Sequence, residues 1–372
     1  MRFARYEIHA RKKDFPVGIS CVADFVLKAE GTVRQAEIVK SEQWSLYCID
    51  FDEGVALFAR MPEGSDLAAR PFVYMTQFEL ATHAAKVPLS SLDELANQVD
   101  RPRELSFIFS TGRCGSTLAS KLLDQIPGVL SISEPDYLTN LAFQKRKVSA
   151  SELDKLAAAA TRLASKRSPG ASTDVVVLKP RSEATVVAEN LARSFPEANR
   201  VFLYRDAIGY VNSLYKYVQR VMGRAAFDDP DAWKSYWSIA TINAPLSLLN
   251  EFFPNDAASV GHTDILALCW WFRMQAHSDA GAIDVGMVPI HYDDLNSNRR
   301  VQTRRLLNGC GIDAEFVDQA LKAFERDSHA GSAGENTVPA QPLSASDKAR
   351  VSELVRRWGL PMFDEERLGT DR

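Results

Sequence analysis

Residues 109–121, FSTGRCGSTLASK, form a glycine-containing loop between an apolar run and a helical pattern. Gly112 and Gly115 lie in the predicted turn, where glycine permits positive φ and a close approach of the backbone to a ligand. With the helix beginning near Ser116, consecutive backbone amides can converge on an anion at its positive end. The amides that we expect at this site belong to Cys114, Gly115, Ser116, Thr117 and Leu118.

The loop departs from the usual triphosphate-binding pattern, G-x-x-x-x-G-K-[ST], in which a lysine reaches the β and γ phosphates. Ser116 stands where that lysine would be, and Arg113 is the only cation in the turn. A guanidinium can bind the oxygens of one phosphate, and of a group bonded to it, in a forked geometry. We therefore expect a ligand shorter than a magnesium triphosphate. The alternative is a tight structural turn between strand and helix.

A second candidate anion site lies in RVFLYRDAIGYVNSLYK, residues 200–216. Arg205 ends an apolar run, and Ser213 follows eight positions later in a helix predicted to begin near Ala207. Both can bind one phosphate at the carboxyl edge of a parallel sheet. The alternative is a local Arg205–Asp206 charge pair and an exposed serine. Together the two sites predict a nucleotide that carries phosphates at two separate places.

Both sites lie in a region where short apolar runs alternate with longer amphipathic helices, from residue 105 to about 310. This alternation predicts βαβ units and an α/β fold with a mainly parallel central sheet. The strand-like runs are LSFIFS (105–110), VLSIS (129–133), DVVVLK (174–179), RVFLYR (200–205) and VGMVPIHY (285–292).

The first 100 residues follow another pattern, so we predict a small β-rich or α+β domain at 1–100 and the larger α/β domain at 101–372. Within the first, residues 44–61 resemble a hairpin around an acidic turn, and residues 71–89 read as a strand or loop entering a helix. The later segment 328–346, rich in Gly, Ser, Ala and Pro, is expected to be a lid or a mobile tail.

The connection between the two predicted domains carries a helix signal of its own. Ser91 and Glu94 have the spacing of a capping box, in which each side chain binds the other residue's backbone amide. We therefore expect a helix to begin at this serine.

Composition excludes several classes of protein. Hydrophobic residues make up 46% of the 372 residues and charged residues 25%, which is typical of a globular protein. A net charge of −4 gives no global attraction for nucleic acid or an anionic membrane. No apolar run approaches the ~20 residues of a bilayer span, and none resembles an export signal, so we expect a cytoplasmic protein.

The five cysteines are odd in number, scattered and without a CxxC pair. This pattern favours reduced thiols over a disulfide framework or a zinc site. Cys114 is the one in a suggestive place, and we interpret it as a small filler of the loop, because no partner base for its thiol is evident.

The two anion motifs together resemble those of the sulfotransferases that use 3′-phosphoadenosine 5′-phosphosulfate. The resemblance covers residues 105–300 and is to the bacterial type of this family. GRCGSTL resembles the family's 5′-phosphosulfate loop, K/R-x-G-[ST]-T, and VFLYRDAIGYVNSL resembles its 3′-phosphate motif. VPIHYDDL (288–295) is similar to the later Y-E-D-L element. The resemblance implies a P-loop-like three-layer α/β fold.

The resemblance also implies roles for individual residues. It assigns the 5′ phosphate and the sulfuryl group to Arg113, Gly115, Ser116 and Thr117. Arg205 and Ser213 take the 3′ phosphate. Lys179, at the end of the third run, matches a strand-end lysine that some members place beside the transferred group; the alternative for Lys179 is a solvated charge after a buried strand.

Sulfuryl transfer requires in-line attack, stabilisation of the leaving phosphate and removal of the acceptor's proton. Arg113 and Lys179 would supply fixed positive charge, and the donor needs no Mg²⁺, so no metal site is expected. Some members use a glutamate after the second strand as the base, and Glu134 has that position. Asp136 is the nearest substitute.

The histidines are weaker candidates for the base. His83, His277 and His291 have no comparable placement in the sequence, and His291 is expected to anchor the structure rather than to act in catalysis.

These observations predict a sulfotransferase that moves a sulfuryl group to a hydroxyl or amine. Two alternatives remain: a P-loop kinase-like phosphotransferase, which would turn over nucleotide with Mg²⁺, and a nucleotide-binding or interaction protein without turnover. We expect the acceptor to be a small molecule or a lipid or glycan precursor, and we expect neither nucleic acid nor a membrane span among the partners.

Overall fold

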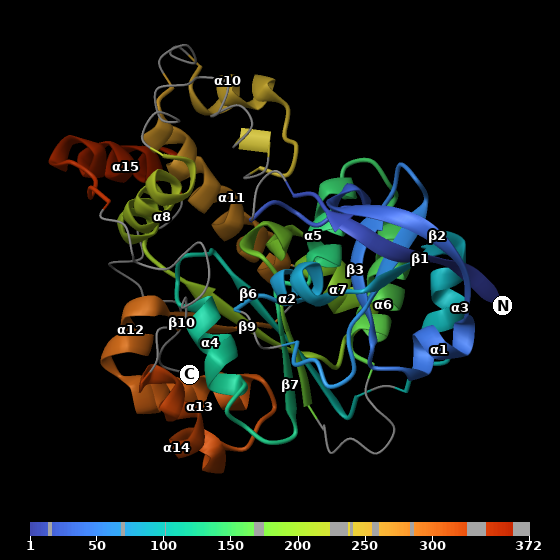
Figure 1. Cartoon of the computed structure of the whole chain (residues 1–372). Helices are drawn as coiled ribbons and strands as arrows, with labels where there is room; N and C mark the ends of the chain where they lie inside the picture. Colours follow the sequence, from blue (N-terminus) through green and yellow to red (C-terminus); the bar gives the residue numbers. More distant parts are fainter. Residues whose placement is uncertain are drawn as a thin grey trace.

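The computed structural model describes two five-stranded sheets of opposite kinds, one antiparallel and one parallel (Figure 1). The residues that the structure describes are 1–13, 17–67, 71–100, 102–166, 175–223, 237–238, 241–254, 260–282, 286–325 and 340–359. Most of the predicted lid segment at 328–346 lies outside these ranges.

The parallel sheet has the strand order β10-β9-β6-β8-β7. Its strands are β6 (Glu104–Ser110), β7 (Val129–Ser133), β8 (Val175–Lys179), β9 (Asn199–Tyr204) and β10 (Val288–His291). Each predicted run overlaps one of these strands, and every pairing is parallel, which confirms the α/β class. The chain leaves β6 toward β7 on one side and leaves β9 toward β10 on the other. The carboxyl ends of β6 and β9 therefore form a topological switch point, where α/β sheets bind ligands.

Alternate residues of the central strands face two separate cores. Phe107, Leu178 and Phe202 belong to one hydrophobic cluster, whereas Ile108 and Val177 belong to the other. Helices on both faces complete a three-layer arrangement. One face carries α4 (Ser116–Leu123), α12 (Tyr292–Ser297), α13 (Arg299–Gly309) and α14 (Val317–Ala320).

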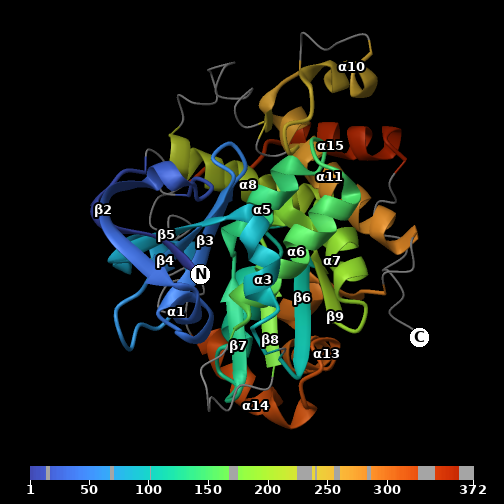
Figure 2. The ribbon, with the colours of Figure 1, turned by 90° about the vertical axis from the view of Figure 1, so that its right-hand side faces the viewer.

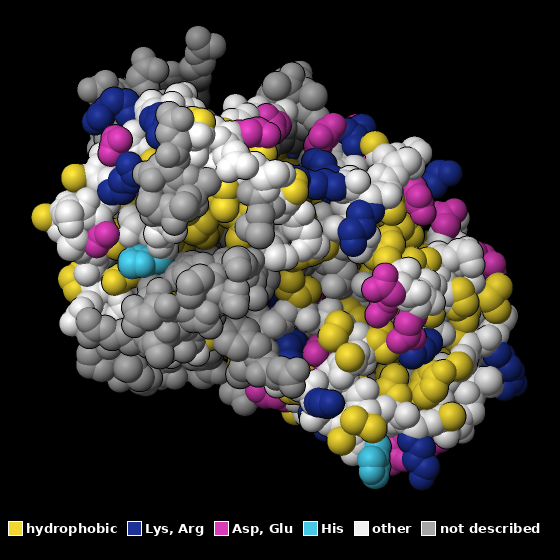
Figure 3. Space-filling model, turned by 90° about the horizontal axis from the view of Figure 1, so that it is seen from above, with side chains coloured by type: hydrophobic (Ala, Val, Ile, Leu, Met, Phe, Trp, Pro, Cys, Tyr) yellow, Lys and Arg dark blue, Asp and Glu magenta, His cyan; other side chains and the backbone are white. Residues whose placement is uncertain are grey.

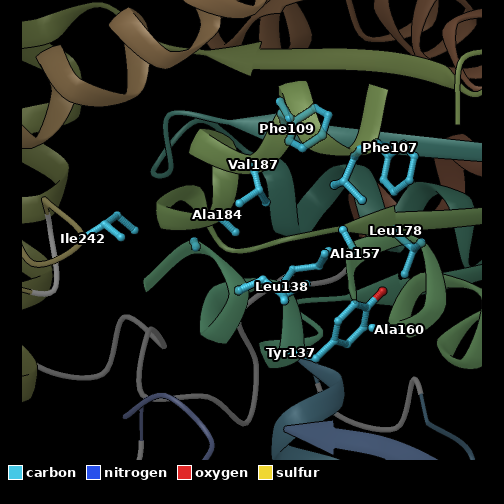
Figure 4. Close-up of a cluster of buried hydrophobic side chains, with 14 of the residues drawn as sticks. Phe107, Phe109, Tyr137, Leu138, Ala157, Ala160, Leu178, Ala184, Val187 and Ile242 are labelled. Carbon is cyan, nitrogen blue, oxygen red and sulfur yellow. The ribbon is translucent and has the colours of Figure 1, made fainter. Parts of the chain in front are cut away.

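The other face of the parallel sheet is covered by a larger set of helices (Figures 1 and 2). In Figure 4, Phe107 and Phe109 of β6 lie in the same buried cluster as Val187 and Leu138. The helices that contribute to this cluster are α5 (Asp136–Gln144), α6 (Ala150–Ala164), α7 (Ala188–Ser194), α8 (Ala207–Met222), α11 (His262–Ala282) and α15 (Ala345–Arg357).

The antiparallel sheet has the order β2-β1-β5-β4-β3. Its strands are β1 (Arg2–Arg11), β2 (Phe25–Arg34), β3 (Trp44–Asp50), β4 (Val55–Arg60) and β5 (His83–Pro88). Helix α1 (Gln35–Lys40) joins β2 to β3, α2 (Val73–Leu80) joins β4 to β5, and α3 (Leu92–Ala96) follows β5 and leads to β6. The predicted hairpin at 44–61 is confirmed by the β3–β4 pairing.

Two local predictions in this region are confirmed only in part. Helix α2 follows a short loop, and α3 begins after Ser91, which is its N-cap residue. Within 71–89 the helix α2 comes first and the strand β5 second, because the alanine-rich HAAKVP is placed between β1 and β4, where small side chains pack in the centre of a sheet. Ser91 forms no side-chain cap on α3. It has helical backbone angles, φ −96° and ψ −9°, whereas a capping serine needs extended ones.

The two sheets share a hydrophobic core. The largest cluster includes Ile49 and Phe58 from the antiparallel sheet and Leu138 and Phe107 from the other unit. In Figure 2 the antiparallel sheet lies beside α5, and β3 packs against α5 and α6. The N-terminal sheet therefore abuts the helix that follows β7, while the domain division near residue 100 stays a prediction.

Three features relate to the classes of protein considered from composition: the surface charge, the apolar character of the helices and the state of the cysteines. Basic and acidic side chains are interspersed over the face seen in Figure 3, in keeping with the net charge of −4. Among the described helices, none has the length and apolar character that a bilayer span requires. All five cysteines are free thiols.

Candidate functional site

The glycine loop joins β6 to α4 at the predicted positions, with the strand ending at Ser110 and the helix beginning at Ser116. Gly112 and Gly115 have φ values of 80° and 79°, in the left-handed region that favours glycine. An added Cβ at Gly115 would lie 3.2 Å from the ring of Tyr292. An added Cβ at Gly112 would lie 2.8 Å from Ser182 Oγ. Both glycines are therefore favoured by the backbone conformation and by the close approach of a neighbour.

The start of α4 is built for contact through its backbone. Gly115 is the N-cap residue, and no side chain caps the helix. Cys114 is buried and its thiol donates to the carbonyl of Leu203 at 3.3 Å, while burial raises its pKa, so the thiol fills the loop as the sequence predicted. Ser116 and Thr117 are buried, and the side chain of Leu118 packs against a hydrophobic cluster. For Leu118, therefore, the backbone amide is a candidate for anion binding and the side chain is not.

The second motif meets the loop directly. Arg113 Nε donates to Ser213 Oγ at 3.2 Å, and Arg205 Nη1 donates to the carbonyl of Arg113 at the long distance of 3.5 Å. Asp206 caps α8 by accepting from the amide of Gly209 at 2.7 Å. Ser213 therefore accepts from Arg113, and Asp206 caps a helix. Both observations differ from the alternative of a local Arg205–Asp206 charge pair with an exposed serine.

The third motif completes this group. The guanidinium of Arg205 lies 4.2 Å from the ring centroid of Tyr292, whose ring also faces Gly115. We call Arg113, Gly115, Arg205, Ser213 and Tyr292 the switch-point cluster. Arg113 and Gly115 follow β6, Arg205 follows β9, Tyr292 follows β10, and Ser213 lies in α8. The three sequence motifs therefore meet at the topological switch point.

One atom of the switch-point cluster marks a site for an anion. Arg205 Nε is buried and has no hydrogen-bond partner among the described residues. A buried donor without a partner costs free energy unless a ligand or water accepts from it. Gly209 allows the guanidinium to sit there, because an added Cβ would lie 2.6 Å from Arg205 Nε. This donor fits a phosphate, and sequence reasoning missed Gly209, whose only signal is its place four residues after the arginine.

A second group lies at the ends of the neighbouring strands β7 and β8. Lys179 is the last residue of β8 and only 1% exposed, and its Nζ donates to Glu134 Oε1 at 2.7 Å. The amide of Glu134 also donates to the carbonyl of Lys179 at 2.6 Å. A solvated lysine, the alternative from sequence, is thereby excluded. Glu134 adopts φ 55°, a conformation that costs a non-glycine residue about 1 kcal/mol or more.

Asp136 and Arg181 surround that pair. Asp136 is fully buried and accepts from Arg181 Nε at 2.5 Å and from Nη2 at 3.0 Å. It also accepts from the amide and the hydroxyl of Ser20, at 2.9 and 2.8 Å. These four bonds make Asp136 a structural anchor. Arg181 Nε lies 3.9 Å from Glu134 Oε2. We call Glu134, Asp136, Lys179 and Arg181 the β7–β8 cluster.

Tyr217 of α8 contacts the switch-point cluster. The Arg113 guanidinium lies 4.8 Å from its ring centroid. Burial raises the pKa of Tyr217, and the charges of Arg113, Arg181 and Glu134 also act on it. Arg113 of the switch-point cluster thus contacts Tyr217 of α8, and charges of the β7–β8 cluster act on the same side chain.

The histidines are engaged elsewhere. His83 pairs with Glu30 of the antiparallel sheet at 3.1 Å. His277 stacks on Phe202 with ring centroids 3.9 Å apart, and burial lowers its pKa to about 4. His291 accepts from the amide of Asp293 through Nδ1 and caps α12, the anchoring role expected from sequence.

Asp206, His291 and Asp293 each offer one ligand atom, and these atoms lie within 4.8 Å of one another. Asp206 and His291 already serve as helix caps, and all three residues are partly or fully exposed. Such a grouping is common on protein surfaces, so we assign no metal to it.

No model of a known protein family matches the chain, and no curated protein sequence matches it. Among solved structures, it is similar to a mouse sulfotransferase complexed with PAP, at 13% sequence identity and a TM-score of 0.38. The similarity covers 76% of this chain and 91% of the mouse chain.

Proposed function

We propose that the protein is a sulfotransferase that moves a sulfuryl group from 3′-phosphoadenosine 5′-phosphosulfate to a hydroxyl or amine. The observation that carries the proposal is the direct contact of the two anion motifs, Arg113 Nε to Ser213 Oγ at 3.2 Å. A nucleotide with phosphates at its 5′ and 3′ positions matches two adjoining anion sites better than a linear triphosphate does. The proposal rests on the site itself together with the sequence resemblance.

The switch-point cluster would hold the donor. The amides at the start of α4 and the Arg113 guanidinium would bind the 5′ phosphate and the sulfuryl group. Arg205 and Ser213 would bind the 3′ phosphate, which would supply an acceptor for Arg205 Nε, a buried donor without a hydrogen-bond partner in the described part of the chain. In this arrangement Arg113 faces both phosphates, because Ser213 is already its neighbour.

The β7–β8 cluster would carry the transfer. The donor supplies an activated sulfur: the acceptor oxygen or nitrogen bonds to that sulfur, and the sulfur–oxygen bond to the 5′ phosphate breaks with its electron pair. Glu134 would take the acceptor's proton on Oε2, since Oε1 is bonded to Lys179. Lys179 carries three N–H donors, so its bond to Glu134 leaves it able to stabilise the leaving phosphate.

The kinase-like alternative fits the site less well. Ser116 stands in place of the lysine that reaches the β and γ phosphates in a triphosphate loop, and its side chain is buried at the start of α4. The buried lysine of this site, Lys179, comes instead from another strand and is paired with a carboxylate.

Calorimetry tests the donor assignment. The protein is titrated with 3′-phosphoadenosine 5′-phosphate (PAP) and separately with ATP and Mg²⁺. We expect PAP to bind more tightly, because only PAP fills both anion sites. Tighter binding of ATP with Mg²⁺ would overturn the assignment in favour of a phosphotransferase.

A screen with sulfur-labelled donor tests the activity. Candidate acceptors are small hydroxyl and amine compounds and soluble analogues of lipid and glycan precursors. Labelled product with any of them supports the proposal. If PAP binds but label passes neither to an acceptor nor to water, the protein is a nucleotide-binding protein without turnover.

A further inference from the structure

The N-terminal antiparallel sheet unit contacts several residues of the β7–β8 cluster, and Arg181 makes the most of these contacts. Arg181 Nη1 donates to the carbonyl of Val17 at 2.9 Å, and Nη2 donates to that of Gly18 at 3.3 Å. Both carbonyls belong to the connection between β1 and β2. The same connection supplies Ser20, whose amide and hydroxyl bind Asp136. The N-terminal unit therefore touches both members of the buried Arg181–Asp136 pair.

Aromatic side chains from the same unit also lie against the two cations of the cluster, Arg181 and Lys179. The Arg181 guanidinium lies 4.1 Å from the ring centroid of Tyr74, and Lys179 Nζ lies 5.2 Å from that of Phe72. The two rings are stacked, with centroids 5.7 Å apart and planes at 4°. Cations over aromatic faces are stabilised, most of all where water is excluded. Helix α2 and its N-cap thus contact both cations of the cluster.

The carboxylate of Glu134 lies between these two cations. Lys179 Nζ donates to Oε1 at 2.7 Å, while Arg181 Nε lies 3.9 Å from Oε2. Two charges on opposite oxygens fix the rotation of a carboxylate more closely than one does. Arg181 in turn is fixed by the forked bond to Asp136 and by the two backbone carbonyls.

We propose that Arg181 is a positioning residue that couples the N-terminal sheet unit to Glu134, so that this unit is an integral part of the transfer site. The inference rests on the proposed function and extends it. The N-terminal unit is needed for transfer and not for donor binding, because the contacts given above join it to the β7–β8 cluster. In this proposal Arg181 acts through Glu134 and not directly on the donor or the acceptor.

The test separates positioning from folding with a double variant. Arg181→Met alone leaves Asp136 buried and unpaired, which destabilises the fold. Arg181→Met combined with Asp136→Asn removes both charges, and the asparagine oxygen can still accept from Ser20. We expect this double variant to recover the thermal midpoint that the single variant loses.

Transfer is measured with sulfur-labelled donor, to an acceptor or to water. We expect kcat of the double variant to remain down by about 10²-fold, the scale of a displaced catalytic group, while PAP affinity stays within about threefold of wild type. Ser20→Ala, which removes one of the two Ser20 bonds to Asp136, is expected to lower kcat severalfold with PAP affinity unchanged.

Arg193→Met with Asp154→Asn is the matched control. Arg193 makes the same forked bond to an aspartate, at 2.9 and 3.1 Å, on α7 and α6 and partly exposed. This control double variant should leave the rate of transfer unchanged.

Recovery of transfer to within about threefold of wild type in the stable Arg181/Asp136 double variant overturns the proposal, because the arginine would then serve folding only. A parallel loss of PAP binding overturns it too, since the defect would not be confined to the transfer step. Failure of the wild-type protein to bind PAP is a different result and removes the proposed function itself.

Discussion

The two clusters of the site are built in contrasting ways. The switch-point cluster comes from strand-to-helix turns, in which short stretches such as GRCGSTL and YRDAIG set the local geometry. The β7–β8 cluster depends on contacts between distant segments, such as Ser20 with Asp136, 116 positions apart, and Arg181 with Val17, 164 apart. The residues of the switch-point cluster can therefore be recognised in the sequence as motifs. Contacts from the N-terminal sheet unit, which packs on α5, complete the arrangement of the β7–β8 cluster.

This contrast suggests a division of labour. Donor binding is expected to depend on the switch-point cluster and to tolerate change in the β7–β8 cluster, whereas the rate of transfer is expected to depend on the β7–β8 cluster. Variants that affect both properties equally would break the distinction.

The largest expected effect is on the rate. Glu134→Gln keeps the shape of the side chain but removes its ability to take a proton, so we expect kcat to fall by roughly 10²- to 10⁴-fold. PAP affinity, measured by calorimetry, should be unchanged. Glu152→Gln, at an exposed position of α6, is the control. Unimpaired transfer by Glu134→Gln would show that another group is the base.

The stability of the fold that supports both clusters is expected to depend on pH through His277. Burial lowers the pKa of His277 to about 4 from its ordinary 6.5, so the unfolded chain binds a proton before the folded one does. Stability from this group is complete above pH 6.5 and is lost as pH falls toward about 4. The loss should amount to about 3 kcal/mol by the lower end of that range.

Chemical denaturation at several pH values measures this loss. His277→Phe, which keeps a ring over Phe202, should remove that part of the decline. His9→Gln, at an exposed position of β1, should leave it in place. An equal decline in wild type and His277→Phe would contradict the assignment.

Arg205→Ala addresses the switch-point cluster. Hydrogen bonds to a charged group contribute about 1.5–3 kcal/mol, so PAP affinity should fall roughly ten- to hundredfold. Arg300→Ala, exposed on α13, serves as the control for lost positive charge. Unchanged PAP binding would place the 3′ phosphate elsewhere.

Ser213→Ala gives the smallest effect. A neutral hydroxyl contributes about 1 kcal/mol, so PAP affinity should fall about fivefold in the same calorimetric titration. Because Arg113 Nε also loses its serine partner, a loss as large as that of Arg205→Ala would mean that the serine acts mainly by orienting Arg113.

Much of the frame was predictable from local patterns. Five apolar runs became five parallel strands, and the turns at Gly112–Gly115 and at Arg205 began helices at Ser116 and Ala207 as expected. These features follow from side-chain periodicity and glycine conformation over a few residues, which act in any fold. HAAKVP shows the limit, because its alanines favour a helix and only its place between β1 and β4 makes it a strand.

The sequence by itself thus determined the strand–loop–helix units and the residue types available at their ends. The tertiary structure decided which of those residues meet: Arg113 with Ser213, Tyr292 with Gly115, and Arg181 with Asp136 and Ser20. The physical reason is that parallel strands bring their carboxyl ends to one edge in an order that no local pattern encodes. A buried charge such as Asp136 also finds its partners only after distant segments have packed around it.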